Sequence, residues 1–574
     1  MTTINRRSFL KGGMAAGLVA LGGMAGCSPS SNQSAPEGET LSATGTPDLP
    51  KGIYAEDFEL SPVLVEPVEE FASEETYDIV VVGAGCSGVP AILTALEEGA
   101  TVGCLQKEPV VAANGKGASA VVVGESTEAG IKRWMCDWAK TNDWRMNMDL
   151  FRFYVDHSEE TLSWITQQSL ALGIEPMMYQ TGETIQYEDG NVVAVFKIMQ
   201  NSNNELMTAL AEKAQADGAV IHFSTPAVQL IKDESGRVTG VVGACEDGTY
   251  IKMNANKAVI LAAGDYSTNP SLVSRYCGDM VEFQPDQMNR TGDGHLMGVL
   301  AGSAIVPANH ARQVHCMYAT QSMYLTTPFL MLDESGNRFM NEEAVMTSWN
   351  TMVKYRHHKT GERPVIYRFF DSAVMEKYPE GDGNLDRLNG IIEQTKMEMG
   401  ADGILARADT LDELFKILGV PATDFQASVD RFNELCAKGS DDDFGMRSDL
   451  MKPIDTPPYF GVMNTLNFAA VNGGLTVNEV YQVVDTDHEV IPGLYAVGTT
   501  GGDLCGGINW SMPGGSSNCH CFTGGRYAVI HALTGDLKAS NPCSWTDIAD
   551  KLAGPDGKPT WQALERASKE IKVW

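Results

Sequence analysis

One stretch near the start of the chain constrains the fold more than any other: Tyr77-Asp78-Ile79-Val80-Val81-Val82-Gly83-Ala84-Gly85-Cys86-Ser87-Gly88. A run of β-branched residues is typical of a buried parallel strand, and residues 89–99 after the glycines have the apolar spacing of a helix. A chance glycine turn is the alternative, but strand, turn and helix together predict a dinucleotide site. Gly83 allows the tight turn, Gly85 admits a pyrophosphate, and Gly88 lets helix pack on strand. The predicted contacts are Gly83, Gly85, Cys86, Ser87 and Gly88.

The residues after the second predicted strand, 101–105, decide how an adenosine ribose is held. Dinucleotide sites place an acidic residue there, whereas this chain has Gln106-Lys107-Glu108. Gln106 can still hydrogen-bond a ribose hydroxyl, although without a charge to strengthen the bond. Glu108 can take this role instead if the strand runs longer. Gln106 and Lys107 are the predicted cofactor contacts here.

The first 27 residues look like an export label rather than part of the fold. Asn5-Arg6-Arg7-Ser8-Phe9-Leu10-Lys11 precedes an apolar, glycine-rich run that is too short for a permanent membrane helix. This pattern resembles a twin-arginine signal peptide, and Met24-Ala25-Gly26-Cys27 resembles a lipoprotein cleavage box. Ordinary signal cleavage with Cys27 unmodified is the alternative. We expect export to the periplasm or cell surface, with membrane contact only through a lipid on Cys27.

Composition narrows the class of partner. A net charge of −32 over 574 residues argues against nucleic acid and against an anionic membrane surface. The chain is too long for one core and should divide into domains. Residues 28–73 are expected to form a flexible linker, because Ser, Thr, Pro, Gly and Glu dominate much of this stretch. The sequence has no CxxC or CxxCH motif, so no metal or haem site is predicted, and most cysteines are expected to be free and buried.

Beyond the second strand, the chain shows further predicted elements. Ala112–Ala120 is a loop of small residues suited to backbone contact with a cofactor. Residues 127–215 are expected to be largely helical, and residues 218–223 to form a strand. Val228–Ile231 and Val238–Val242 flank Glu234-Ser235-Gly236, which predicts a hairpin.

The order of four segments along the chain is characteristic of a protein family. The segments are Gly83–Gly88, Val259–Gly264, Gly292-Asp293-Gly294 with Ala301-Gly302, and Ile491–Gly498. This order resembles the FAD-binding flavoproteins of the fumarate reductase, urocanate reductase and 3-ketosteroid dehydrogenase superfamily, and the likeness covers residues 74–532. It implies an α/β fold whose Rossmann-like FAD-binding domain is discontinuous, at residues 74–304 and 445–540. An α+β cap domain at 305–444 is inserted between the halves, and a helical tail at 541–574 follows.

The resemblance also implies which residues contact FAD. Besides the turn, Gln106 and Lys107, these are Gly115, Gly117, Ala118, Ser119, Val228, Ala263, Gly264, Asp293, Gly498, Thr499 and Ser516. In the cap, Gly336–Glu342 resembles the family's Gly-x-Arg-Phe-x-Asn-Glu segment. Thr410 is the expected N-cap of a closing helix, with Glu413 at the capping-box position.

The substrate site departs from the fumarate reductases. Hydride delivery to one carbon of a double bond needs a proton for the other carbon and a group that polarises the substrate. The family's proton-donating arginine falls on Met346 here, and its carboxylate-clamping arginine falls near Ser511 or Met512. No arginine stands between Asp503 and Gly524. Because a thioether cannot donate a proton, we expect a substrate other than a small dicarboxylate.

Two tyrosines and a histidine are the candidate catalytic residues. By resemblance, His315 falls where fumarate reductases keep a substrate-binding histidine, and Tyr318 and Tyr324 lie near their carboxylate-binding residues. A phenol can act as an acid or polarise a carbonyl. Core packing is the competing interpretation for both tyrosines, and a structural role is favoured for His310 and His315. Trp510–Gly515 is closer to the ketosteroid dehydrogenase pattern, and the many methionines of the cap suit a bulky planar substrate.

Two other features are discounted as sites. Cys519-His520-Cys521 cannot converge on one metal ion, since neighbouring residues of a helix point about 100° apart. Arg338 is expected to form an ion pair with Glu342 or Glu343.

The expected function is reduction of an activated C=C bond, in an enoate or enone, by an exported FAD-dependent oxidoreductase. The sequence has no second dinucleotide motif and no haem or iron–sulfur ligands, so electrons are expected from a membrane quinol-linked cytochrome or a similar donor. The alternatives are a ketosteroid-type dehydrogenase running the reverse reaction, and a flavin-binding protein without activity.

Overall fold

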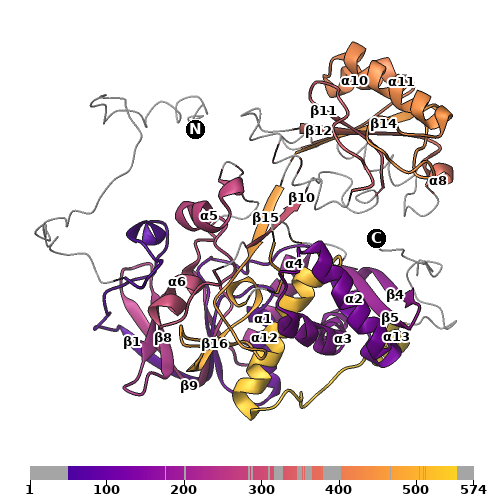
Figure 1. Cartoon of the computed structure of the whole chain (residues 1–574). Coiled ribbons are helices and arrows are strands. Elements are labelled where there is room, and N and C mark those ends of the chain that lie inside the picture. Colours follow the sequence, from indigo (N-terminus) through magenta and orange to yellow (C-terminus); the bar gives the residue numbers. More distant parts are fainter. Residues whose placement is uncertain are drawn as a thin grey trace, which may run out of the picture. The chain divides into compact units, whose positions relative to one another are not determined.

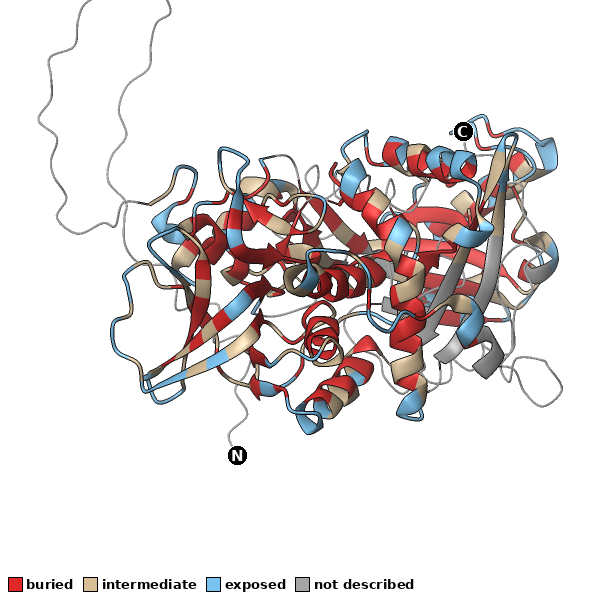
Figure 2. Ribbon diagram, turned by 90° about the horizontal axis from the view of Figure 1, so that it is seen from below, coloured by how far each residue is buried: buried red, intermediate tan, exposed pale blue. Residues whose placement is uncertain are grey.

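The computed structural model describes residues 49–174, 176–199, 202–281, 283, 285, 289–307, 310–315, 327–344, 352, 355, 365–378, 403–465, 467–502, 504–507, 510 and 512–552. Figure 2 shows that buried residues run along the helices and strands, whereas exposed residues gather at loops and at the outer faces of helices. Among the described residues, no helix combines the length and the apolar character that a membrane crossing requires.

The largest sheet has the strand order β16-β17-β9-β1-β2-β6, with β8 attached to β9 and β7 to β8 (Figure 1). β1 (Ser73–Val82) lies between β2 (Val102–Leu105) and β9 (Tyr250–Leu261) and runs parallel to both. β6 (Val220–His222) and β17 (Val490–Ala496) continue the sheet in parallel on its two sides. β16 (Gln482–Val484) is antiparallel to β17. The predicted parallel strand is thus confirmed, and its Ile79, Val80 and Val81 are fully buried.

The predicted hairpin is also confirmed, because β7 (Ala227–Lys232) pairs antiparallel with β8 (Val238–Ala244). The predicted helical stretch at 127–215 is partly wrong. It contains α2 (Glu128–Thr141), α3 (Met148–Ala171) and α4 (Asn203–Ala216), but also the antiparallel strands β4 (Pro176–Tyr187) and β5 (Gly190–Met199). With β3 (Gly117–Val121) they form a three-stranded sheet. The two-residue connection at Glu188-Asp189 before Gly190 is a hairpin signal that the helical interpretation overlooked.

Helix α12 (Ser516–Thr534) joins the C-terminal part of the chain to the N-terminal part by packing beside α1 (Gly88–Glu97) and α3 (Figure 1). The contact contains a buried ionic network around Arg526, whose side chain is fully shielded from solvent. Its Nη1 lies 3.0 Å from a Glu97 oxygen and its Nη2 lies 2.9 Å from a Glu160 oxygen. Tyr527 donates a hydrogen bond to Glu160, and the guanidinium lies 4.1 Å from the Trp164 ring centroid.

A second, four-stranded sheet has the order β11-β12-β14-β13 and is antiparallel throughout. Its strands are β11 (Leu330–Asp333), β12 (Val365–Asp371), β13 (Gly403–Ala408) and β14 (Tyr459–Thr465). Helices α10 (Leu411–Leu418) and α11 (Ala422–Lys438) supply Leu414, Phe415 and Phe425 to its own buried apolar cluster. Thr410 caps α10 as predicted, since its Oγ1 accepts the Glu413 N–H. Most of this α+β unit lies within the expected cap at 305–444, but β14 comes from the stretch that was expected to belong to the FAD-binding domain. The exact domain boundaries stay predictions.

Residues 49–72 differ from the predicted flexible linker. Ile53 and Val63 belong to the main buried core, and the Asp57 carboxylate is fully buried 2.8 Å from Arg275 of α5 (Pro270–Tyr276). An apolar residue every few positions, with one buried ion pair, attaches this stretch to the fold.

The remaining helices and strands come from several parts of the chain. α6 (Asp293–Leu300) follows the Gly292 turn, and β10 (Ala311–His315) pairs antiparallel with β15 (Asn467–Asn472). The short helices α8 (Val374–Lys377) and α13 (Trp545–Leu552) complete the described chain, and α13 lies within the predicted helical tail. All ten cysteines of the described residues are free thiols, five of them buried.

Candidate functional site

The glycine turn after β1 is packed so closely that side chains are excluded. Gly83 has a φ of +102°, and a Cβ on it would lie 2.5 Å from the Ala262 carbonyl oxygen. A Cβ on Gly88 would lie 1.7 Å from the Gly83 carbonyl oxygen, and one on Gly85 would lie 2.8 Å from that of Ala112. The turn therefore has a bare backbone surface, and α1 begins directly behind it at Gly88. This is the arrangement that presents backbone N–H groups to a pyrophosphate.

Gln106 lies at the end of β2, but its side-chain amide is engaged with the protein backbone. Its Oε1 accepts the Ala84 N–H at 2.8 Å, and its Nε2 donates to the Val110 carbonyl at 2.8 Å. Lys107 Nζ bonds Thr291 at 2.7 Å and Asp293 at 3.1 Å. Gln106 thus braces the turn, and its contact with a ribose stays a prediction. Lys107 and Asp293, both predicted as cofactor contacts, form one ion pair.

Hydrogen bonds from Asn203 and Asn518 help to hold the small-residue loop at 112–120. Asn203 donates its backbone N–H to the Gly115 carbonyl at 2.8 Å and its side-chain amide to the Asn114 carbonyl at 3.1 Å. Asn518 of α12 donates to the Gly117 carbonyl at 2.8 Å. Gly117 opens β3, in which Ala118 and Ser119 are buried. Asn203 and Asn518 were missed from the sequence, although a polar Ser-Ser-Asn run at the start of α12 is a usable signal.

The C-terminal segment reaches the same turn. Gly498 has a φ of +61°, and a Cβ on it would lie 2.3 Å from Ser87 Oγ and 3.2 Å from Cys521 Sγ. Thr500 Oγ1 donates to the Gly264 carbonyl at 2.8 Å. A Cβ on Gly83 would also lie 3.2 Å from Ala263 Cα. Gly83, Ser87, Ala263, Gly264 and Gly498 are therefore brought together from three parts of the chain, with Thr499 between Gly498 and Thr500.

Val228 lies apart from the turn in a buried position of β7. Its carbonyl accepts the Leu64 N–H at 2.9 Å, so the segment before β1 uses this backbone group. A contact of Val228 with the cofactor stays a prediction.

The N-terminus of α12 is a second feature suited to negative charge. Gly515 precedes the helix with a φ of +81°, and the buried Ser516 Oγ has no hydrogen-bond partner among the described residues. The first turn of a 19-residue helix carries a partial positive charge from its unpaired N–H groups. This end of α12 can therefore stabilise an anionic group.

The Cys519-His520-Cys521 run, discounted above as a metal site, is engaged with backbone carbonyls. Cys519 Sγ faces the Ser158 carbonyl, and His520 Nδ1 donates to the Ser517 carbonyl at 2.7 Å. Within the described part of the chain, no three His, Cys, Asp or Glu side chains are placed to hold a metal ion. Burial raises the pKa of Cys521 to about 11 and that of Cys86 to about 12, so both stay protonated thiols.

His310 has a structural role, as the sequence favoured. Its Nδ1 accepts a hydrogen bond from the Tyr266 hydroxyl, and its Nε2 donates to the Val306 carbonyl at 2.7 Å. Its ring stacks on Tyr276 with centroids 4.4 Å apart. Burial lowers the pKa of His310 to about 4, so the imidazole is neutral. The neighbouring Arg312 is buried as well, donating to the His310 carbonyl at 2.7 Å and lying 2.7 Å from Asp279.

The predicted catalytic residues are only partly covered by the structure. His315 ends β10 and pairs with Asn467 of β15, but its side chain lies outside what is described. Tyr318 and Tyr324 lie outside the described residues, as do Met346 and Ser511. Their roles stay predictions.

Arg338 forms the predicted ion pair. Its Nη2 lies 2.6 Å from Glu342 Oε2 and 2.8 Å from Asp441 Oδ2. Glu343, the other predicted partner, contacts Arg447 instead.

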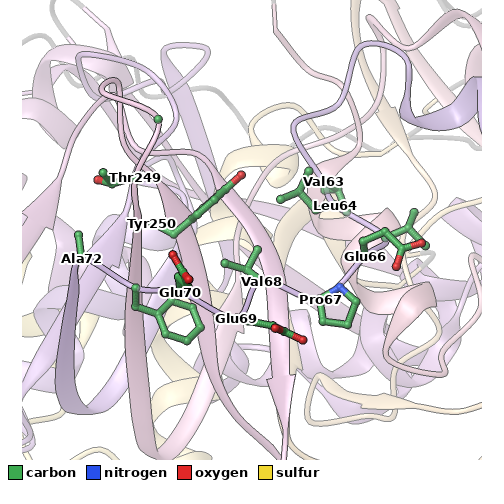
Figure 3. Close-up of a pocket in the computed structure, with 13 residues that line it drawn as sticks. Val63, Leu64, Glu66, Pro67, Val68, Glu69, Glu70, Ala72, Thr249 and Tyr250 are labelled. Atoms are coloured by element: carbon green, nitrogen blue, oxygen red, sulfur yellow. The ribbon is translucent and has the colours of Figure 1, made fainter.

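The surface has a hollow of about 890 Å³, and no residue of the glycine turn lines it (Figure 3). It is lined by residues 63–72 and 248–250, and Figure 3 shows the carboxylates of Glu66, Glu69 and Glu70 around it. Gln229 holds the overlying segment by accepting the Val68 N–H and donating to the Glu66 carbonyl. None of the predicted site residues lines this hollow.

The bare glycine turn, the end of β9 beside it and the unpartnered Ser516 hydroxyl fit a dinucleotide cofactor, and the parallel sheet is the fold that carries such sites. The fold and site thus define a dinucleotide-binding protein built on a parallel sheet. The family model described as "FAD binding domain" matches residues 78–519, and the chain belongs to this family. FAD is therefore its cofactor.

Two relatives are enzymes of known activity. The chain is 26% identical over 501 residues to a vinyl phenol reductase of Lactiplantibacillus plantarum, covering 80% of this chain and 97% of the relative. It is also 26% identical over 475 residues to a urocanate reductase of Eggerthella lenta, covering 79% and 74%. The family resemblance inferred from the ordered motifs is thereby confirmed, and the relatives are reductases acting on C=C bonds.

Two solved structures share the fold. A flavocytochrome c3 fumarate reductase in its open conformation matches with a TM-score of 0.61 and 22% identity, covering 80% of this chain and 79% of that chain. A 3-ketosteroid dehydrogenase from Rhodococcus jostii matches with a TM-score of 0.55 and 20% identity, covering 81% and 98%. The predicted α/β FAD-binding fold is confirmed.

Proposed function

We propose that the protein reduces an activated C=C bond, in an enone or enoate, of a bulky or aromatic substrate that is not a dicarboxylate. The observation that carries this proposal is the loss of both arginines that fumarate reductases use. Met346 stands at one position, and no arginine occurs between Asp503 and Gly524 at the other. A dicarboxylate depends on such charge-assisted hydrogen bonds.

Two arginines, Arg312 and Arg338, support this proposal, because protein groups hold their side chains. Arg312 donates to the His310 carbonyl and pairs with Asp279. Arg338 is shared between Glu342 and Asp441. Each has a protein partner of its own, so neither replaces the missing carboxylate clamp.

Apolar side chains near the start of α12 also support it. Met512 is buried, and the Trp510 ring lies 5.8 Å from the ring of His520. Aromatic and thioether side chains favour a flat apolar substrate over a small dianion. The relative from Lactiplantibacillus plantarum is named for a phenol that carries no carboxylate.

The chemistry needs two contributions. Bound FAD supplies a hydride from its reduced form. The chain must supply a proton for the other carbon and a hydrogen bond to the electron-withdrawing group. We assign these to the cap, with Tyr318 and Tyr324 as the candidate acids and His315 as their partner. A phenol suits a neutral, polarised carbonyl.

An assay with reduced viologen as the electron donor tests the proposal. The purified protein receives enones, aryl enoates and steroid enones in parallel with fumarate and succinate. Turnover confined to the neutral and aryl substrates supports the proposal. Robust fumarate reduction contradicts it.

The same assay separates the two other candidates. A ketosteroid-type dehydrogenase is favoured by the motif Trp510-Ser511-Met512-Pro513-Gly514-Gly515, and it oxidises a saturated ketone with an artificial acceptor rather than reducing the enone. A flavin-binding protein without activity shows neither reaction, although its flavin is reduced by viologen.

We further propose that the protein works outside the cytoplasmic membrane with a quinol-linked cytochrome as electron donor. Arg6-Arg7 and the box ending at Cys27 support export and lipidation. Replacing both arginines by lysine should keep the protein in the cytoplasm. Cys27→Ser should release exported protein from the membrane. Normal export of the Lys-Lys variant contradicts the twin-arginine route.

A further inference from the structure

A buried carboxylate without a hydrogen-bond partner on one oxygen lies beside the glycine turn. Asp265 directly follows Gly264 at the end of β9, and its side chain is fully buried. One oxygen accepts the Ser267 N–H at 2.7 Å. The other, Oδ2, has no hydrogen-bond partner among the described residues. A buried carboxylate left in this state is costly, so a nearby cation is required.

Arg290 is that cation, but its guanidinium does not form a hydrogen bond with Asp265. Its Nη1 lies 3.7 Å from Asp265 Oδ2, beyond hydrogen-bond distance. Its backbone carbonyl accepts the Thr268 N–H at 3.0 Å, which ties residue 290 to the chain just after Asp265. No hydrogen bond of the guanidinium itself is recorded within the described ranges. A group with five donors is thus left able to bind a further acceptor.

The guanidinium faces the cofactor turn. A Cβ on Gly264 would lie 2.7 Å from Arg290 Nη1, so the charged group rests against the Gly264 backbone. Gly264 adjoins Ala263, whose Cα flanks Gly83 of the turn. The positive charge of Arg290 also acts on the thiols of Cys86 in the turn and Cys521 in α12, lowering their pKa against the larger effect of burial.

We infer that Arg290 is a ligand of the FAD diphosphate and that Asp265 positions its guanidinium. The diphosphate carries two negative charges and offers oxygens that match the planar fork of an arginine. Asp265 alone would repel the diphosphate, whereas the pair presents a held cation. The inference concerns cofactor binding and does not depend on the substrate proposed above.

Binding to the flavin-free full-length chain tests the inference. FAD binding is followed by flavin fluorescence, and ADP serves as a probe with the diphosphate but no flavin ring. Arg290→Met should weaken both ligands by about 10- to 100-fold, since a charge-assisted hydrogen bond is lost. Arg290→Lys keeps the charge but not the planar fork, so its affinities for FAD and ADP should lie between those of the wild type and of Arg290→Met. Arg152→Met, at a half-buried arginine paired with Glu128 and Asp156, is the matched control and should change neither affinity. FAD release from the holoprotein on dilution gives a second readout.

The double variant Arg290→Met/Asp265→Asn distinguishes two roles of Arg290, binding the diphosphate and neutralising Asp265. If Arg290 binds the diphosphate, Asp265→Asn recovers only part of the loss, because the repulsion is removed but the ligand is still missing. Full recovery of FAD and ADP binding would mean that Arg290 merely neutralises Asp265. Loss of FAD affinity with unchanged ADP affinity would place the guanidinium on the flavin ring. Either of these two results overturns the inference.

Discussion

The side-chain amide of Gln106 is hydrogen-bonded to the backbone of Ala84, the residue between the first two glycines of the turn. Oε1 accepts the Ala84 N–H at 2.8 Å, and Nε2 donates to the Val110 carbonyl at 2.8 Å on the far side of the loop. One uncharged side chain thus links the glycine turn, which must face the pyrophosphate, to the loop that follows β2.

Gln106→Leu should therefore loosen the cofactor site. The change leaves the Ala84 N–H and the Val110 carbonyl unpaired, each costing about 1–3 kcal/mol where it is buried. We expect FAD affinity to fall by roughly 10-fold or more, together with a lower urea midpoint. Gln106→Glu keeps the acceptor and loses the donor, so its FAD affinity and urea midpoint should lie between those of the wild type and of Gln106→Leu. A Leu variant with unchanged FAD affinity and stability would show that the brace is unimportant.

Arg526→Met should destabilise the fold strongly. Removing the guanidinium leaves Glu97 and Glu160 without their buried partner, and breaking a buried ion pair costs about 3–5 kcal/mol. Urea unfolding followed by circular dichroism measures the loss. Arg431→Met removes an exposed arginine that pairs with Asp443, and it should change the urea midpoint little. Equal effects of the two variants would argue against the buried network as a main tie between α1, α3 and α12.

Stability should fall as the pH is lowered from about 6.5 to 4. Burial lowers the pKa of His295 and His310 to about 4, whereas a histidine in the unfolded chain titrates near 6.5. In this window the unfolded chain binds protons that the folded chain does not, so acid favours unfolding. The neutral histidines therefore contribute fully to the free energy of unfolding above about pH 6.5, and this contribution is lost as the pH falls to about 4.

His310→Gln tests the assignment. It removes the titrating ring, so the slope of unfolding free energy against pH should decrease, by at most about 1.4 kcal/mol per pH unit. His488→Gln, at an exposed position, is the control and should leave the slope unchanged. An unchanged slope in the His310 variant would mean that the folded imidazole titrates normally.

Tyr318→Phe or Tyr324→Phe should slow product formation. General-acid assistance contributes about 10²–10⁴-fold, and the essential tyrosine should lose that factor on the true substrate. Flavin content and flavin reduction by viologen should stay unchanged, which separates the proton step from cofactor binding. Full activity in both single variants would place the acid elsewhere in the cap or the C-terminal loop.

Local steric signals explain what could be predicted from the sequence. Gly83 and Gly88 occupy positions where a Cβ has no room, and that requirement is visible as a motif. Thr410 likewise marks the start of a helix, because its Oγ1 accepts the N–H of Glu413 three residues later.

Contacts between distant residues explain what could not be predicted. Asn518 reaches the Gly117 carbonyl across 401 residues, and Arg290 faces Asp265 only because β9 and the loop before α6 meet. A motif gives the position of Gln106 but not the direction of its amide, so its bonds to Ala84 and Val110 could not be predicted. The β4–β5 hairpin could not be predicted, because the helical periodicity of the stretches before and after it was taken to continue through it.

The central claim is that the reduced flavin delivers its electrons to a C=C bond in a substrate that is not a dicarboxylate. It is tested most directly in one anaerobic turnover, in which the viologen-reduced holoprotein is mixed with an aryl enone or with fumarate and flavin reoxidation is recorded. The enone should reoxidise the flavin with one equivalent of saturated product. Fumarate should react at least about 100-fold more slowly, because two charge-assisted hydrogen bonds are missing. Equal or faster reoxidation by fumarate, with succinate as product, would contradict the account.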